Sequence, residues 1–368
     1  MERLKGKYHW FKADESLFSF FENEIAGDKV VLVIPKGEKA VGVPWYENEK
    51  IYRSSVWRVS DGFPVSLGYK KFVNFGEQPD FEPVNINDKI TAIEKVDGTC
   101  LICSKYKGEY IFRTRGCYEA SSMHNGNEVP MLVERYNIKR ILDENEGCSI
   151  IFEWTTPTNI LCVKYDEPDL FLTGIVEHST YSYKRQEYLD DFAARYGLKR
   201  PRNHTVENCN ADVLAASIRD WINAEGVVAY FGEEQQVLKK MKSNWHFHLH
   251  VARGLIGNTK KLIKFLFENN AFDGDREFYN KKIESLLEYE TLVYYEEKLD
   301  EVWNAWKEYN ANLALAKELV KDVHGVDEIV EGIRERRFPL SDTYIWAAYR
   351  KKEHRKSFVF DELIRLCS

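Results

Sequence analysis

The sequence lacks any long hydrophobic run. Its longest purely apolar stretch covers residues 30–34, whereas a helix that crosses a bilayer needs roughly 20 such residues. The charged first residues are not followed by an apolar region, so no secretory signal is expected. Seven cysteines are an odd number in a chain of 368 residues, which is too large to need disulfide staples. We therefore predict a cytoplasmic protein without membrane contact, in a reducing compartment.

Glycine and proline are both missing from a long part of the C-terminal third. Neither occurs between residues 275 and 324, and residues 202–338 contain no proline. Apolar residues recur there at steps of three and four, as from Leu299 to Val302, Trp303 and Trp306. This spacing is typical of amphipathic helices. We predict an all-α domain over residues 251–368, preceded by a first domain over residues 1–250.

The first two thirds of the chain instead contain short β-type runs between turn residues. A lysine–glycine pair at 107–108 separates two of these runs and indicates a hairpin. Two helical stretches, 185–196 and 211–223, interrupt the pattern. We predict an α+β domain built on antiparallel sheet, with strands at 30–34, 51–59, 90–95, 99–106, 110–114, 149–154, 170–175, 226–231 and 236–241.

The segment around Lys95 carries the clearest chemical signal. A strand-type run at 90–93 leads into Glu94 and Lys95, and Asp97-Gly98 can form a tight turn directly after them. A lysine held at the end of a rigid strand suits covalent catalysis. A surface lysine before a turn would give the same local pattern. No phosphate-binding loop of the G-x-x-x-x-G-K-[S/T] type occurs, which disfavours a kinase of that class.

A lysine nucleophile must lose its proton. At an ordinary pKa only about one lysine in 2,500 is neutral at pH 7. Lys240 and Lys242 are two residues apart on a predicted strand, so their side chains share one face. They are candidates to neutralise a phosphate, and their positive charge would lower the pKa of Lys95. A solvated basic strand face is the alternative interpretation.

Several segments, taken in order, resemble a known superfamily. The resemblance is to the covalent nucleotidyltransferases, in which a lysine attacks the α-phosphate of a nucleotide. Its successive motifs correspond to Lys95-Val96-Asp97-Gly98, Phe152-Glu153-Trp154, Glu225-Gly226-Val227-Val228 and Lys240-Met241-Lys242-Ser243.

Further segments resemble one branch of that superfamily, the bacteriophage RNA ligase 1 family, over roughly residues 40–250. These segments are Lys71-Phe72-Val73-Asn74-Phe75-Gly76-Glu77, Arg113-Thr114-Arg115-Gly116, Thr156-Pro157-Thr158-Asn159 and Lys242-Ser243-Asn244-Trp245. After Trp245 that family tends to have an aromatic residue, where this chain has His246.

The resemblance implies a fold and a set of residue roles. The fold is an antiparallel-sheet nucleotidyltransferase domain, ATP-grasp-like, followed by an all-helical RNA-recognition domain. ATP is the implied cofactor, with Mg²⁺ or alternatively Mn²⁺. The implied roles are Lys95 as the AMP-bound nucleophile, Lys240 and Lys242 as catalytic and nucleotide-binding lysines, Glu225 as the metal ligand, and Glu153, Glu94, Arg53, Lys71 and Arg115 as further nucleotide- or phosphate-binding residues.

The implied reaction joins a 5′-phosphate RNA end to a 3′-hydroxyl end. It passes through lysyl-AMP and 5′-adenylylated RNA. By the same resemblance, the substrate is RNA such as cleaved tRNA in an infected bacterial host, and a separate kinase or phosphatase heals the ends. The protein is expected to be a monomer. A DNA ligase, an mRNA capping guanylyltransferase and a non-catalytic RNA-binding protein on a ligase-like fold remain the alternatives.

The net charge of −7 argues against a generally basic nucleic-acid binder. Residues 236–266, however, contain seven lysines and arginines and no acidic residue. We predict that this basic track contacts RNA phosphates. Cys100 and Cys103 lack a second pair at zinc-finger spacing, and His246, His248 and His250 alternate on what reads as a strand, without identifiable metal partners.

Overall fold

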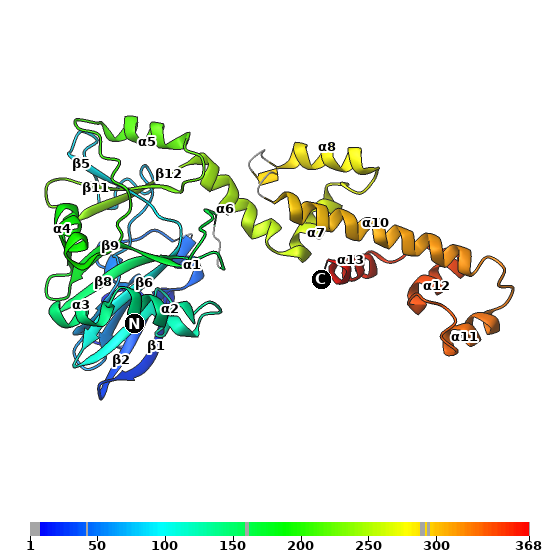
Figure 1. The fold of residues 1–368 in the computed structure, drawn as a ribbon, viewed down its shortest axis with the longest axis horizontal. Coiled ribbons are helices and arrows are strands. Elements are labelled where there is room, and N and C mark those ends of the chain that lie inside the picture. The colour runs from blue at the N-terminus through cyan, green and yellow to red at the C-terminus, as the bar shows by residue number, and fades with distance from the viewer. Residues whose placement is uncertain (1–7, 42, 159–161, 288–290, 293–294, 368) are drawn as a thin grey trace, which may run out of the picture. The chain divides into compact units, whose positions relative to one another are not determined.

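The computed structural model describes residues 8–41, 43–158, 162–287, 291–292 and 295–367 (Figure 1). The first residues of the chain and Asn159 therefore lie outside the described part. The chain folds into two compact units, residues 1–247 and 248–368. The boundary falls inside helix α6 (Asn244–Ile256). Each unit is described by itself.

The first unit contains three antiparallel sheets. The first has the order β1-β2-β3-β4, the central one β10-β9-β8-β6-β7, and the third β12-β11-β5. The strands are β1 (Phe18–Ile25), β2 (Asp28–Pro35), β3 (Ser55–Arg58), β4 (Pro64–Leu67), β5 (Ile90–Glu94), β6 (Thr99–Tyr106), β7 (Glu109–Thr114), β8 (Cys148–Thr155), β9 (Asp169–Glu177), β10 (Ser182–Tyr183), β11 (Gly226–Phe231) and β12 (Val237–Lys242).

Helices and short 3-10 turns complete the first unit. Figure 1 shows α2 and α3 near the central sheet and α5 beside the third sheet. The helices are α1 (Gly37–Val41), α2 (Glu128–Arg135), α3 (Ile138–Glu144), α4 (Gln186–Tyr196) and α5 (Ala211–Arg219), and the 3-10 turns are η1 (Glu15–Leu17), η2 (Lys50–Tyr52) and η3 (Ala120–Ser122).

The alternation of side chains along the strands builds two layers of core. On β8, Phe152 and Trp154 face helices α2, α3 and α4, while Ile151 faces the other two sheets. On the third sheet, Val227 and Ala229 pack against α5, and the opposite face joins the central core. Antiparallel sheets with helices on their outer faces confirm the predicted α+β class.

Some elements were not predicted, for identifiable reasons. Strand β1 is largely exposed and carries Glu22, Asn23 and Glu24 in sequence, so its pattern does not read as a strand. Helix α2 contains Pro130, which is tolerated because it falls in the first helical turn.

The prediction of a strand around His246, His248 and His250 is wrong. Helix α6 begins at Asn244, and the Ser243 hydroxyl caps it by accepting a hydrogen bond from the His246 N–H at 3.0 Å. The three histidines therefore do not share one strand face: His246 is buried, whereas His250 is exposed.

In the described part of the second unit every regular element is helical. Within the described residues, the stretch without glycine or proline includes the helices α8 (Arg276–Leu286) and the long α10 (Glu296–Leu319). Further helices of this unit are α7 (Thr259–Glu268), α11 (Val326–Arg334), α12 (Asp342–Tyr349) and α13 (Lys356–Leu366). Their apolar faces share one core, which includes Leu266, Val302, Ile345 and Leu363. No helix among the described residues is long and apolar enough to span a bilayer.

A buried polar chain joins the first sheet to the central sheet. The Arg113 guanidinium is fully buried and donates to the Ser66 hydroxyl at 2.8 Å. The Ser104 hydroxyl oxygen lies 2.8 Å from the hydroxyl oxygens of both Ser66 and Ser149. The chain ends at His178 Nε2, which lies 2.8 Å from the Ser149 hydroxyl oxygen. Burial, together with the charge of Arg113, lowers the pKa of His178 to about 4.

We expect His178 to make the first unit sensitive to mild acid. Its folded pKa lies below its ordinary value of 6.5, so the stabilisation is complete above pH 6.5 and is lost as the pH falls towards about 4. The loss should reach about 3 kcal/mol. Denaturant unfolding between pH 7 and 4 measures this loss. His178→Gln keeps polar atoms but should flatten this dependence, whereas His324→Gln, at an exposed position, should leave it intact. Equal pH slopes in both variants would contradict the assignment.

Candidate active site

One face of the third sheet presents three lysines towards the central sheet. Lys95 directly follows β5 and shares the face of Ile93, and its backbone N–H donates to the Gly226 carbonyl at 2.8 Å. Lys240 and Lys242 lie on β12, on the face of Leu238. We call Lys95, Lys240 and Lys242 the site lysines. The predicted shared face of Lys240 and Lys242 follows directly from the strand.

Glu225 links two of the site lysines. Its carboxylate is buried, with Oε2 at 2.7 Å from Lys95 Nζ and Oε1 at 2.7 Å from Lys242 Nζ. The residue that follows must be glycine, because Gly226 has φ +134° and a Cβ there would lie 2.1 Å from the Met241 carbonyl oxygen. This close approach of β11 to β12 fixes Glu225 between the two lysines.

The pKa of Lys95 is raised in this structure, which differs from the lowered pKa that we expected. Burial is the largest influence and would lower the pKa, but the negative charges of Glu225, Glu153 and Asp97 outweigh it. The expectation considered the neighbouring cations and a bound divalent metal, but no carboxylates. The fold also surrounds Lys95 with carboxylates, so without a ligand the amine is held protonated.

Glu153 faces Lys95 from β8 of the central sheet. Its Oε1 accepts the Gly98 backbone N–H at 3.2 Å. Burial raises the pKa of Glu153 to about 7, with further contributions from Glu225 and Asp97, although the charge of Lys95 opposes the shift. A Cβ at Gly98 would lie 2.5 Å from the Trp154 carbonyl oxygen, so the turn after Lys95 packs directly on β8.

Sequence reasoning missed Asp97 as more than a turn residue. Its Oδ2 accepts the backbone N–H groups of Cys162 and Val163, at 2.7 and 2.9 Å. Its Oδ1 lies 3.4 Å from His246 Nε2. Burial raises the pKa of Asp97, but His246 and these backbone donors outweigh it and lower the pKa to about 2. The only signal in the sequence was its place in the Lys95-Val96-Asp97-Gly98 segment.

A second group of cations lies beside Lys240. The Arg53 guanidinium and Lys240 Nζ lie 5.6 and 5.4 Å from the centre of the Phe72 ring, and Lys71 Nζ lies 5.4 Å from the Trp45 ring. Residues 73–75 run along β12, with the Lys240 N–H donating to the Val73 carbonyl at 3.0 Å. Burial and then the positive charges of Arg53 and Lys71 lower the pKa of Lys240 to about 7.

The remaining predicted residues are placed differently. Arg115 is exposed, whereas the Arg113 guanidinium, two residues earlier, is buried and hydrogen-bonded within the buried polar chain. The Glu94 carboxylate accepts the Arg202 backbone N–H at 3.2 Å, and alternation puts it on the opposite face from Lys95. The structure thus brings Lys95, Lys240, Lys242, Glu153, Glu225, Arg53 and Lys71 to one region, but not the Glu94 side chain. Arg115 lies at the edge of this region: burial lowers the pKa of Arg53 and of Lys71, and the positive charge of Arg115 lowers both further.

The residues fit a divalent cation that also contacts phosphate. Glu225 supplies a buried carboxylate, and the lysine side chains beside it favour bound phosphate. A hard metal ion such as Mg²⁺ is usually bound by one or two carboxylates together with phosphate oxygens and water. Glu225 would hold the ion.

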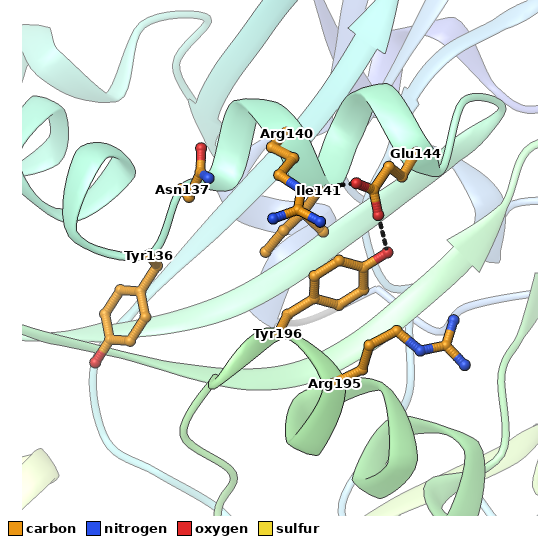
Figure 2. A pocket seen from close by; sticks show the side chains of 7 residues that line it. All are labelled: Tyr136, Asn137, Arg140, Ile141, Glu144, Arg195 and Tyr196. Atoms are coloured by element: carbon orange, nitrogen blue, oxygen red, sulfur yellow. Dashed lines mark hydrogen bonds and ion pairs between the residues drawn. The ribbon is translucent and has the colours of Figure 1, made fainter.

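A separate pocket lies between α3 and α4 (Figure 2). Arg140 and the Tyr196 hydroxyl each contact the Glu144 carboxylate at 2.7 Å in it. None of the predicted site residues lines this pocket, so we place the active site at the site lysines instead.

Antiparallel sheets thus gather three lysines and a buried glutamate at one candidate site. A family model described as RNA ligase, of the phage T4 RNA ligase 1 type, matches residues 63–254, which is slightly more than half of the chain. The chain belongs to this RNA ligase family and is an enzyme of that kind. The resemblance noted from its motifs is confirmed.

Individual proteins are also similar to this chain. A putative RNA ligase of Thermovibrio ammonificans is 26% identical over 316 residues, which cover 81% of this chain and 80% of that protein. An archaeal ATP-dependent RNA ligase structure has 16% identity and a TM-score of 0.48, covering 77% of this chain and 76% of that one. A Naegleria gruberi RNA ligase variant with ATP and manganese has 16% identity and a TM-score of 0.39, covering 45% of this chain and 52% of that one.

Lys240 should change its charge near neutral pH. We expect its amine to titrate at about pH 7, and Arg53→Gln to raise that pKa because a like charge is removed. NMR of isotope-labelled lysine amines between pH 6 and 10 measures both values. Lys89→Gln, which alters an exposed lysine paired with Glu233, serves as the control and should leave the titration of Lys240 unchanged. A Lys240 amine that is still fully charged at pH 9 would refute the assignment.

Proposed function

We propose that this enzyme is an ATP-dependent RNA ligase that works through a covalent Lys95–AMP intermediate. The observation that carries the proposal is the position of Lys95. Its amine lies at the end of a rigid strand, 2.7 Å from a buried glutamate that it shares with Lys242. Two further lysines of the same face supply the positive charge that a phosphoryl transfer requires.

The first step forms the nucleotidyl-enzyme. Lys95 Nζ, once deprotonated, attacks the α-phosphorus of ATP, an N–P bond forms and the bond to pyrophosphate breaks. Lys240 and Lys242 neutralise charge on the phosphates, and Glu153 orients the ribose. Glu225 would hold a Mg²⁺ or Mn²⁺ ion, which would supply charge neutralisation at the phosphates, and its carboxylate would then be withdrawn from Lys95. Losing that carboxylate lets the pKa of Lys95 fall, because it is the largest influence that raises it.

The next two steps join RNA. A 5′-phosphate oxygen of an RNA end attacks the adenylyl phosphorus, so the N–P bond breaks and a 5′–5′ pyrophosphate forms. A 3′-hydroxyl then attacks the activated 5′-phosphorus and AMP leaves. Arg53, Lys71 and Arg115 are the candidates that hold the phosphates of ATP or of the RNA end. Each step is a displacement at phosphorus, in which positioning and charge stabilisation dominate.

Replacing the nucleophile tests the proposal directly. We expect Lys95→Ala to lose formation of the protein–AMP adduct from labelled ATP by at least about 1,000-fold, because no other group on the strand end can form the N–P bond. Lys89→Ala removes an exposed lysine before the same strand and should retain the adduct. A mass increase equal to AMP on the peptide that contains Lys95 completes the assignment. RNA joining that survives in Lys95→Ala, or an adduct formed only from GTP, would refute the mechanism.

We further propose that the natural substrate is cleaved tRNA, whose ends a separate kinase or phosphatase prepares. The protein would act as a monomer in the cytoplasm of an infected bacterium. This part of the proposal rests on the resemblance to the phage enzymes and on the helical second unit, for which we propose RNA recognition.

The predicted basic track does not form one surface. Lys239 is buried and donates to the Phe81 carbonyl at 2.7 Å, and Lys242 is engaged by Glu225. Lys260, Lys261 and Lys264 are exposed on α7. The side chain of Arg253 lies outside the described part. Only the α7 lysines therefore remain available as an extended RNA surface from this track.

A second basic segment of the same unit connects α12 to α13. This basic connector, residues 350–356, has five basic residues, all exposed, and one acid. Within the described part of the chain no carboxylate pairs with its basic side chains. His354 anchors it, with Nδ1 at 2.8 Å from the Tyr309 hydroxyl and its ring against Phe358. A fixed backbone with cations directed outward suits phosphate contacts.

Charge removal from the basic connector tests its contact with RNA. We expect the double variant Lys351→Gln, Lys352→Gln to weaken RNA binding and to reduce the slope of log K against log salt by roughly 0.7–0.9 for each lost contact. The double variant Lys317→Gln, Lys321→Gln removes the same charge from exposed positions in and just after α10 and should bind as the wild type does. Filter binding at several salt concentrations measures both. Equal slopes in the two variants would exclude the connector.

A further inference from the structure

A buried group of mixed metal-ligand type lies beside the active site and has no role in the proposed reaction. It consists of Asp97, Cys162 and His246, here called the metal triad. Their exposed fractions are 5%, 2% and 3%, and the potential ligand atoms all lie within 4.8 Å of one another. The three residues come from the turn after β5, the segment before β9 and the start of α6.

The spacing within the metal triad suits a tetrahedral ion. Asp97 Oδ1 and His246 Nε2 are 3.4 Å apart. In a tetrahedral zinc site, with metal–oxygen and metal–nitrogen bonds of about 2.0–2.2 Å, adjacent ligands are about 3.4 Å apart. The fourth position is left to a water molecule, because Glu225 Oε1, which lies 3.8 Å from the same His246 nitrogen, is engaged by Lys242 at 2.7 Å.

The surroundings hold two of the ligands in place. Asp97 Oδ2 is fixed by the backbone N–H groups of Cys162 and Val163, which leaves Oδ1 directed at His246. The first turn of α6 is fixed in turn by the Ser243 hydroxyl, which accepts the His246 N–H. Such outer contacts orient ligands and are typical of metal sites.

The donor set selects the kind of metal. A thiol, an imidazole and one carboxylate suit Zn²⁺ and similar borderline cations, whereas Mg²⁺ prefers oxygen ligands in an octahedron. None of the seven cysteines forms a disulfide, so no disulfide competes for Cys162. We propose that Asp97, Cys162 and His246 bind one Zn²⁺-type ion that ties together the three segments around Lys95, separately from the Mg²⁺ that we assign to Glu225. The inference concerns binding and does not depend on the proposed ligase reaction.

Cobalt substitution tests the site, because a cobalt–thiolate bond gives a charge-transfer absorption that oxygen ligands do not. We expect the metal-free full chain to develop this absorption with one equivalent of Co²⁺, and Zn²⁺ to abolish it by displacement. Millimolar Mg²⁺ should leave it unchanged. Absence of the thiolate absorption, or its removal by Mg²⁺ alone, would overturn the proposal.

Matched variants locate the ligands. Cys162→Ser should lose the charge-transfer absorption and His246→Gln should weaken Co²⁺ binding at least about 100-fold, whereas Cys209→Ser alters a cysteine outside the triad and should behave as the wild type does. Circular dichroism confirms that each variant folds. Absorption that persists in Cys162→Ser refutes the site.

One measurement avoids variants altogether. X-ray absorption of the zinc-loaded wild type should show one sulfur ligand with nitrogen and oxygen ligands. A zinc ion without sulfur in its shell would equally refute the site. Loading should also raise the melting temperature, because the ion binds only the folded chain.

Discussion

The carboxylate of Glu225 is the interaction on which the rest of the active site depends. It is buried and holds two amines from two different strands, Lys95 after β5 and Lys242 on β12. A buried charge of this kind is stable only while its partners remain, and removing one partner of such a pair typically costs about 3–5 kcal/mol. The same carboxylate therefore closes the third sheet around the site and keeps Lys95 protonated until a ligand competes for it.

Within this arrangement, Lys95 and Lys240 lie in opposite electrostatic environments. In the free enzyme, negative charge around Lys95 stabilises the fold but suppresses the nucleophile. Beside it, Lys240 experiences the reverse environment, where burial, Arg53 and Lys71 lower its pKa to about 7. The nucleotide that we propose as ligand would bring phosphates to the cations and a divalent cation to the carboxylates. The charges of the candidate site are thus complementary to that ligand as well as paired with one another.

Part of this structure could be read from the sequence because it depends on local pattern. Runs such as 226–231 are short and apolar and contain β-branched residues, and the lysines at 240 and 242 share a face through strand geometry alone. The start of α6 was misread because its decisive signal is a single capping hydroxyl, Ser243, before alternating histidines. The raised pKa of Lys95 and the meeting of Asp97, Cys162 and His246 could not be predicted. They arise where segments that are distant in the sequence pack together, and a local sequence pattern does not show which distant side chains come into contact.

The pairing of β11 with β12 has a consequence for how this chain can vary. Lys240 faces the site, whereas Lys239 on the opposite face is buried against the Phe81 carbonyl. A shift of β12 by one residue against β11 would exchange the two faces and put Lys239 and Met241 where Lys240 and Lys242 now lie. Insertions or deletions in the connection at residues 232–236 are therefore compatible with the candidate site only if they leave the register of β12 against β11 unchanged, because even a shift by two residues would separate Lys242 from Glu225.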